Sequence, residues 1–195
     1  DRRWSDCSPA DRKRVLLRFA ERIREARDEL ALLESLDVGK PIRDTLSVDV
    51  PSAAKTIQWY AETIDKVYGD VGPTGPDALS LVTREPIGVV AAIVPWNYPL
   101  IITAWKLGAA LATGNSVVLK PASQSPLSAL RLAELASEAG VPDGVFNVVP
   151  GPGPVVGPAL ARHPGVDKLT FTGSTEVGKS LLRAVGESDV KAITL

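Results

Sequence analysis

The fold is decided by residues 88–123, which read GVVAAIVPWNYPLIITAWKLGAALATGNSVVLKPAS. Residues 89–94 form an uninterrupted apolar run rich in β-branched side chains. Such a short run is typical of a strand that is covered on both faces of a parallel sheet. Pro95 ends this strand, because proline lacks the N–H group that a ladder requires. Residues 95–98 therefore follow the carboxyl end of a buried strand, where open α/β sheets bind ligands.

Asn97 is the candidate for chemistry in this loop. Its side-chain amide can donate to a developing oxyanion without titrating, as acyl-transfer chemistry requires. The alternative is that Asn97 only serves the turn between two prolines, a setting that asparagine favours. A second predicted strand, residues 116–120, ends in Lys120. This lysine could reach a ribose hydroxyl or a phosphate, or it could simply be solvated.

From residue 87 onward, predicted strands and helices alternate. Alternation with short connections predicts a parallel sheet that has helices on both faces. The expected fold class is therefore α/β, a doubly wound, Rossmann-like parallel sheet preceded by two helices and a short β excursion. Strands are expected near residues 88–94, 116–120, 145–149, 168–172 and 191–195, and helices near residues 99–112, 126–139, 154–162 and 175–185.

Two helices are predicted before the sheet. Ser8 and Pro9 mark the start of the first, and its apolar residues between 16 and 33 recur at steps of three and four, giving one stripe. Interleaved acidic and basic side chains favour a solvated face with ion pairs over an anion-binding surface. The second helix is expected over residues 51–67, with Val67 facing inward.

Composition limits the class of function. The chain has 195 residues, of which 45% are hydrophobic and 23% charged, and its formal net charge is −1. These values predict a globular protein and give no indication of nucleic acid or an anionic membrane as partner. No apolar run approaches the ~20 residues of a membrane span. A single cysteine fits a reducing cytoplasm, and the sole histidine, His163, has no partner at ligand spacing, so no metal site is expected.

Three motifs occur in order: PWNYP at residues 95–99, KPAS at residues 120–123 and FTGSTEVGK at residues 171–179. Together with ESLDVGKP at residues 34–41, they resemble the aldehyde dehydrogenase superfamily, specifically its NAD(P)-binding half. The resemblance covers nearly the whole chain. It implies oxidation of a small aldehyde to a carboxylic acid with NAD or NADP. Residues 34–69 look most similar to the γ-glutamyl-γ-aminobutyraldehyde dehydrogenases of polyamine breakdown, whose substrates are aminoaldehydes.

The resemblance also implies a domain organisation. Residues 1–70 are expected to form helices that pack on the cofactor domain. Residues 71–86, which begin with a Gly/Pro-rich turn region and continue into a short predicted strand, are expected to leave that domain as a β excursion toward an oligomerisation element. Residues 87–195 are the expected dinucleotide-binding domain, and a catalytic domain is absent. Assembly into a homo-oligomer, a dimer or tetramer, is implied for the full-length protein.

Phosphate recognition has two candidate segments. The usual Gly-x-Gly-x-x-Gly fingerprint after the first strand is absent. The nearest glycine cluster, residues 151–157, is one residue too long and could be only a tight turn. Residues 173–178 open a predicted helix, whose free amides and dipole favour a pyrophosphate. Gly173 permits close backbone approach, and Ser174 either donates to the cofactor, caps the helix or does both.

The resemblance assigns cofactor contacts to single residues. Lys120 and Ser123 are expected to face the adenine ribose. Many NAD-preferring members carry a glutamate where this chain has Ser123, and a serine does not repel a 2′-phosphate, so NADP is expected to be tolerated beside NAD. With the helix argument, the expected cofactor-binding residues are Ile93, Val94, Pro95, Trp96, Lys120, Ser123, Gly153, Gly157, Phe171, Gly173, Ser174 and Val177.

The family's chemistry also needs a cysteine nucleophile and a general base. Asn97 matches the oxyanion donor, but Cys7, the single cysteine, lies far from the motifs and is interpreted as structural or incidental. The family's glutamate base would directly follow Leu195, and its cysteine lies further downstream. With no methionine in the sequence, we interpret the chain as an internal fragment that is inactive by itself; N-terminal processing is the alternative.

Two other classes of function stay open. One is a noncatalytic nucleotide-binding or assembly module, and the other is an acyl-phosphate or acyl-CoA reductase that shares the fold. Tyr98 and Trp105 follow Asn97 and are candidates to line a substrate tunnel, although Trp105 could equally belong to the core.

Overall fold

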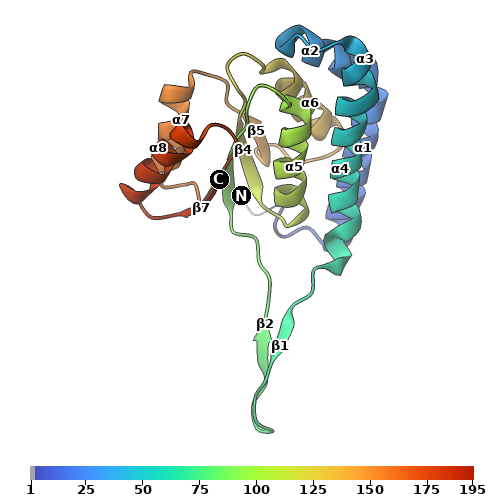
Figure 1. Ribbon diagram of the computed structural model, residues 1–195. Helices are drawn as coiled ribbons and strands as arrows, with labels where there is room; N and C mark the ends of the chain where they lie inside the picture. The colour runs from blue at the N-terminus through green and yellow to red at the C-terminus, as the bar shows by residue number, and fades with distance from the viewer. Residues whose placement is uncertain (1–2) are drawn as a thin grey trace.

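A five-stranded parallel sheet organises the computed structural model, which describes residues 3–195 (Figure 1). The strands lie in the order β5-β4-β3-β6-β7, and each neighbouring pair is parallel. The doubly wound α/β prediction is therefore confirmed. The strands are β3 (Val89–Ile93), β4 (Ser116–Lys120), β5 (Phe146–Val148), β6 (Lys168–Phe171) and β7 (Ala192–Thr194).

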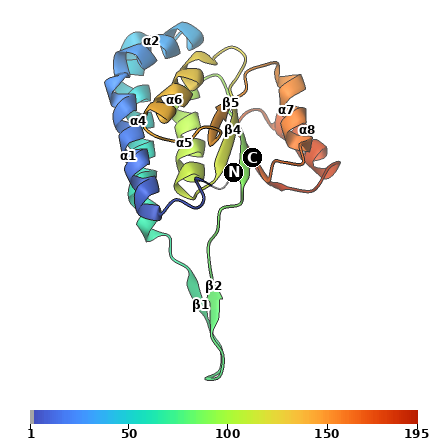
Figure 2. The same cartoon turned by 180° about the vertical axis from the view of Figure 1, so that it is seen from behind.

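Helices cover both faces of this sheet. α5 (Pro99–Ala112) and α6 (Leu127–Glu138) lie on one face, and α7 (Gly153–Arg162) and α8 (Thr175–Gly186) lie on the other (Figures 1 and 2). From β3 the chain winds outward to β5 and then returns to the other side of β3 at β6. The strand order thus reverses at β3, and the carboxyl ends of β3 and β6 form the switch point at which such sheets bind ligands.

The N-terminal helices form a further layer outside α5 and α6. α1 and α4 contact α5, and α1 and α2 contact α6. Ser8 caps α1, as predicted, by accepting the N–H of Asp11 at 3.1 Å. The elements of this layer are α1 (Pro9–Glu25), α2 (Arg27–Val38), α3 (Ile42–Asp44), the π-helical turn η1 (Thr45–Asp49), α4 (Val50–Thr63) and the 3-10 turn η2 (Ile64–Lys66).

Two predictions for this layer are wrong. The single apolar stripe over residues 16–33 is broken at Ala26, where α1 ends and α2 begins in a new direction, so Leu33 is only half-buried. Val67 is exposed rather than buried, because α4 ends at Thr63 and the chain then turns toward the hairpin. Gly39 ends α2 in the left-handed conformation, with φ 77°.

A β-hairpin extends away from the sheet and its helices (Figures 1 and 2). Its strands β1 (Asp70–Gly72) and β2 (Ser80–Val82) are antiparallel, and Val71 pairs with Leu81. The sequence predicted β2 but not β1. Both Val71 and Leu81 are exposed. Within the described residues, no helix is long and apolar enough to cross a membrane.

Candidate functional site

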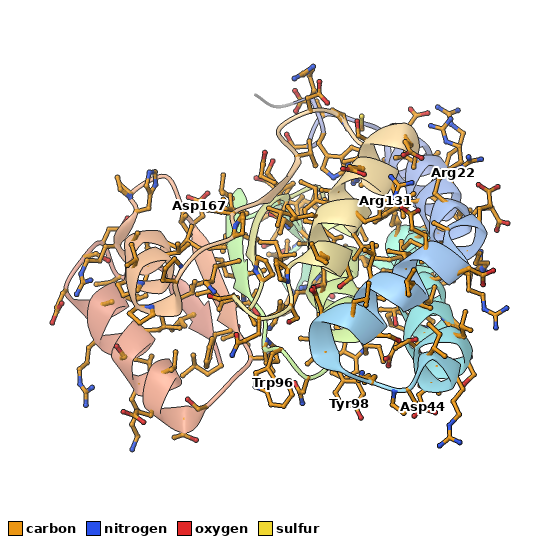
Figure 3. All side chains as sticks on the ribbon, turned by 90° about the horizontal axis from the view of Figure 1, so that it is seen from above. Arg22, Asp44, Trp96, Tyr98, Arg131 and Asp167 are labelled. Atoms are coloured by element: carbon orange, nitrogen blue, oxygen red, sulfur yellow. The ribbon has the colours of Figure 1, made fainter. Side chains whose placement is uncertain are left out.

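Three strands end level at the carboxyl edge of the sheet. Ile93 of β3 pairs with Lys120 of β4 on one side and with Phe171 of β6 on the other. The pairing continues just past the strands, because Val94 donates to the Lys120 carbonyl at 3.2 Å and Thr172 donates to the Ile93 carbonyl at 3.0 Å. The loops that follow these strands therefore meet at one edge, which Figure 3 shows from above.

The loop after β3 carries Asn97 to this edge. Val94 is buried and Pro95 half-buried, whereas Trp96 is 54% exposed and Asn97 is exposed. Trp96 and Tyr98 both lie on this edge in Figure 3. Tyr98 is the N-cap residue of α5, so Asn97 directly precedes the positive end of a helix dipole. A donor so placed can stabilise a developing negative charge.

Lys120 is almost fully buried at the end of β4. Its side chain donates to the carbonyl of Pro121 at 2.7 Å, the residue is only 4% exposed, and burial lowers the pKa of its ammonium group. The alternative of a solvated lysine is therefore wrong. Ser123 is exposed and donates to the carbonyl of Gly151 at 2.9 Å. This hydrogen bond ties the loop after β4 to the loop after β5.

The three glycines of the cluster after β5 have different surroundings. Gly151 has φ 149°, and a Cβ there would lie 2.8 Å from Val156, so this position requires glycine. Gly153 is the first residue of α7, and a Cβ at this position would have no other atom within 4 Å. Gly157 is buried between α7 and α8, with Leu181 at an ordinary contact distance of 3.7 Å from the Cβ position. The sequence analysis singled out Gly153 and Gly157 and missed the constraint on Gly151.

The turn from β6 into α8 presents a helix N-terminus at the same edge. Phe171 is buried, and its ring lies so close to Gly173 that a Cβ there would be 2.5 Å from it. Ser174 accepts the N–H of Val177 at 3.3 Å, which confirms the capping role. The first N–H groups of a helix have no partner within the helix. After the cap on Val177, the amides of the exposed residues Thr175 and Glu176 are the ones left without an acceptor in the helix.

Two ionisable residues near this edge escaped the sequence analysis. Lys106 of α5 donates to the hydroxyl of Thr170 in β6 at 2.9 Å, and burial lowers its pKa to about 8. Its signal in the sequence was its position as the one charged residue of α5. Glu34 of α2 is fully buried, and burial raises its pKa to about 7. The sequence analysis left open whether Trp105 belongs to the core. Its side chain is exposed, so that alternative is wrong.

Cys7 and His163 lie outside the site. The Cys7 thiol is half-buried and donates to the Arg3 carbonyl at 3.1 Å. His163 lies between α7 and β6 and accepts the N–H of Gly165 at 3.0 Å. No group of three or more His, Cys, Asp or Glu side chains within residues 3–195 is arranged to hold a metal ion.

Comparison with known protein families matches residues 1–195 to the aldehyde dehydrogenase family. The NADP/NAD-dependent aldehyde dehydrogenase PuuC of Escherichia coli is 58% identical over 192 residues, which are 98% of this chain and 39% of that protein.

Solved structures agree with this match. The γ-glutamyl-γ-aminobutyraldehyde dehydrogenase of Burkholderia cenocepacia has a TM-score of 0.96 and 57% identity, over 98% of this chain and 38% of that one. An indole-3-acetaldehyde dehydrogenase solved in complex with NAD+ has a TM-score of 0.96 and 57% identity, over 97% of this chain and 38% of that one. The chain therefore spans well under half the length of these relatives.

Proposed function

The chain belongs to the aldehyde dehydrogenase family, and from this premise we propose that it is the coenzyme-binding portion of an NAD(P)-dependent enzyme that oxidises aldehydes to carboxylic acids. One observation carries the proposal. The exposed Asn97 amide and the N-terminus of α8 lie at the same edge of the sheet, because β3 and β6 pair from Val90 through to Ile93. This arrangement supports the proposal, because it would set a donor for an oxyanion beside a site for a pyrophosphate.

The residues at this edge fit a dinucleotide. The first-turn amides of α8 and its dipole would hold the pyrophosphate, and Gly173 leaves its backbone unshielded by a side chain. Phe171 and Val177 would flank the cofactor, and the backbone of residues 93–96 would lie alongside it. Gly153 and Gly157 would shape the neighbouring helix, with Lys120 and Ser123 toward the ribose. A bound nicotinamide supplies the acceptor for the hydride that leaves the substrate.

Asn97 is the catalytic residue that we assign within this chain. Its side-chain N–H would stabilise the oxyanion that forms when a nucleophile attacks the aldehyde carbonyl. The only cysteine, Cys7, lies before α1 and cannot serve as that nucleophile from there. We therefore propose that residues 1–195 alone bind the cofactor without turning over substrate, and that a cysteine and a glutamate base come from further sequence.

We further propose an aminoaldehyde as substrate, with the protein acting in the cytoplasm. The name of the Burkholderia cenocepacia structure supports this class of substrate. The exposed aromatic side chains of Tyr98 and Trp105 would contact it beside Asn97. We propose the same division of the chain as before: residues 1–70 as a supporting layer, residues 71–86 as the excursion that helps subunits assemble into a dimer or tetramer, and residues 87–195 as the cofactor domain.

The test uses the complete open reading frame, assayed with a panel of aldehydes and NAD or NADP. Asn97→Ala and the nearly isosteric Asn97→Asp are expected to lower kcat by about 10²–10³. Cofactor binding, followed by fluorescence titration, should be unchanged. Asp143→Ala, an exposed change in the loop before β5, is the control. An active wild type whose kcat survives loss of the Asn97 donor would contradict its role, and no aldehyde oxidation at all would leave a cofactor-binding or assembly module.

Ser123 tests the cofactor preference. Because a serine at this position does not repel a 2′-phosphate, NADP is expected to bind within about a hundredfold of NAD, a gap of less than about 2.7 kcal/mol. Ser123→Glu is expected to weaken NADP and spare NAD, whereas Ser123→Thr keeps the hydroxyl that contacts Gly151. Titration of both cofactors measures the ratio, and a wild type that binds NADP beyond the hundredfold limit contradicts the prediction.

A further inference from the structure

A buried carboxylate reaches the start of α5 from the N-terminal layer. Glu34 lies on α2 and is fully buried, and its Oε1 accepts the N–H of Leu100 at 3.3 Å. Leu100 is the second residue of α5, so its N–H has no partner within the helix. A carboxylate at this end also interacts favourably with the helix dipole. The hydrogen bond thus ties α2 to a point three residues after Asn97.

A second contact from the same layer holds the residue next to Asn97. The Lys40 ammonium lies 3.8 Å from the centre of the Tyr98 ring, a cation–π contact. Lys40 is itself fixed by Asp49, whose Oδ2 accepts from it at 2.7 Å and whose side chain is buried. Asp49 ends η1, and π-helical turns occur often at functional sites. Figure 3 shows Tyr98 beside this part of the chain, near Asp44.

We propose that Glu34 and Lys40 are positioning residues, which fix the loop of residues 95–98 and thereby the direction of the Asn97 amide. The inference rests on the proposed function of Asn97. β3 anchors the loop on one side through Val94, and the two contacts to Tyr98 and Leu100 anchor it on the other. Asn97 lies between these anchors and is exposed, as is its neighbour Trp96. An oxyanion donor is effective when it is held in place before the reaction.

A purely structural role explains the buried Glu34 carboxylate poorly. The second carboxylate oxygen of Glu34 is buried, and no hydrogen bond of good geometry reaches it within the described residues; the neighbouring Ser128 hydroxyl makes only a weaker polar contact. Replacing a buried ionic group by a well-packed apolar residue is often neutral or stabilising. Stability alone would therefore favour an apolar side chain at this position. The hydrogen bond from Leu100, which holds the start of α5 in one orientation, is a function that an apolar side chain at this position could not perform.

Kinetics of the full-length enzyme test the inference. Glu34→Ala and Lys40→Met are each expected to lower kcat about tenfold or more per folded enzyme, while the Kd for NAD stays within about twofold. Glu34→Gln keeps an acceptor for Leu100, and Lys40→Arg keeps the cation over Tyr98, so both should recover most of kcat. Glu29→Gln is the matched control, because Glu29 lies on the same helix but pairs with Arg131 at the surface. It should behave as wild type.

Hydrogen exchange gives a readout that does not depend on turnover. The backbone amides of residues 96–98 and 100–101, the non-proline positions of this segment, are expected to exchange about tenfold faster in Glu34→Ala and Lys40→Met than in Glu29→Gln. Unchanged exchange in this segment, or a loss of thermal stability with kcat intact, overturns the inference. A Kd for NAD that rises in step with the loss of kcat overturns it as well, because the contacts would then support the whole edge. Faster exchange in a protein that oxidises no aldehyde overturns only the proposed function.

Discussion

The two faces of the sheet are built differently. On the face of α5 and α6, one large apolar cluster extends through these helices into α1 and α4, with Phe19 and Leu107 among its buried members. On the face of α7 and α8, a separate and smaller cluster contains Leu169 and Leu181. A second helical layer stands behind α5, whereas α7 and α8 lie at the outside of the described structure (Figures 1 and 2).

This difference shows how each half of the site is held. The Asn97 loop is fixed by long-range contacts from the N-terminal layer, through Glu34 and Lys40. The start of α8 is instead fixed by local contacts: the cap from Ser174 and the ring of Phe171 against Gly173. We infer that the proposed oxyanion donor lies on the more rigid half and the proposed cofactor site on the less rigid one. Three changes probe this comparison.

Core truncation should separate the faces most strongly. Leu107→Ala, in the large cluster, is expected to lower the free energy of unfolding by about 4 kcal/mol, because helices enclose this cluster and a cavity remains. Leu181→Ala, in the smaller cluster, should cost about 2 kcal/mol, since α7 and α8 are free to close the gap. Urea unfolding measures both. Equal losses would mean that the clusters are equally well packed, against the comparison.

The buried carboxylate of Glu34 makes the stability of the folded state depend on pH, through the face of α5 and α6. Burial raises the pKa of Glu34 from 4.5 to about 7. The nearby charge of Asp49 raises the pKa further, and the pKa is lowered in part by polar contacts with Ser128 and the Leu100 amide and by the charge of Lys40. The folded state therefore holds the proton more tightly, and stability falls as pH rises from about 4.5 to 7. Glu34→Gln should lie within about 1 kcal/mol of wild type at pH 5 and exceed it by up to about 3 kcal/mol at pH 8.

Thermal unfolding at the two pH values measures this difference. Glu29→Gln, on the same helix, is the control and should keep the wild-type dependence on pH. A Glu34→Gln variant that is no more stable at pH 8 than wild type would show that the carboxylate is already well solvated or neutralised there, contrary to its burial.

The smallest effect comes from two matched helix caps. Ser8 caps α1 behind the large cluster, and Ser174 caps α8 at the site. Each serine-to-alanine change should cost about 1 kcal/mol of stability, because one helix N–H loses its acceptor. Only Ser174→Ala is expected also to weaken NAD binding. Thermal unfolding and cofactor titration measure the two quantities, and an equal effect of both variants on NAD affinity would count against a cofactor site at α8.

Local patterns predicted the sheet well. β4 was predicted at residues 116–120 and lies at Ser116–Lys120, and β3 is one residue shorter at each end than its prediction. Both are short β-branched runs bounded by glycine, asparagine or proline, so their limits are set by neighbouring residues. β1 was missed because Asp70–Gly72 contains a single apolar residue, and it forms only because β2 is there to pair with it.

Those parts of the candidate site that depend on neighbouring residues were also predicted. The capping role of Ser174 depends on a residue three positions away, and the exposed position of Asn97 follows from the end of β3. The contact between Glu34 and Leu100 joins residues 66 positions apart, and no local pattern indicates it. The break of the first helix at Ala26 was missed because no glycine or proline marks it, so that packing alone decides where α1 ends.

The sequence by itself determined the alternation of strands and helices, the caps at Ser8 and Ser174, and the motifs that identify the family, because each depends on residues close together in the chain. The tertiary structure decided the strand order β5-β4-β3-β6-β7 and the burial of Glu34, Lys106 and Lys120. Burial and long-range hydrogen bonds arise only when the crossovers bring distant segments together, and burial is what shifts the pKa values of these three side chains.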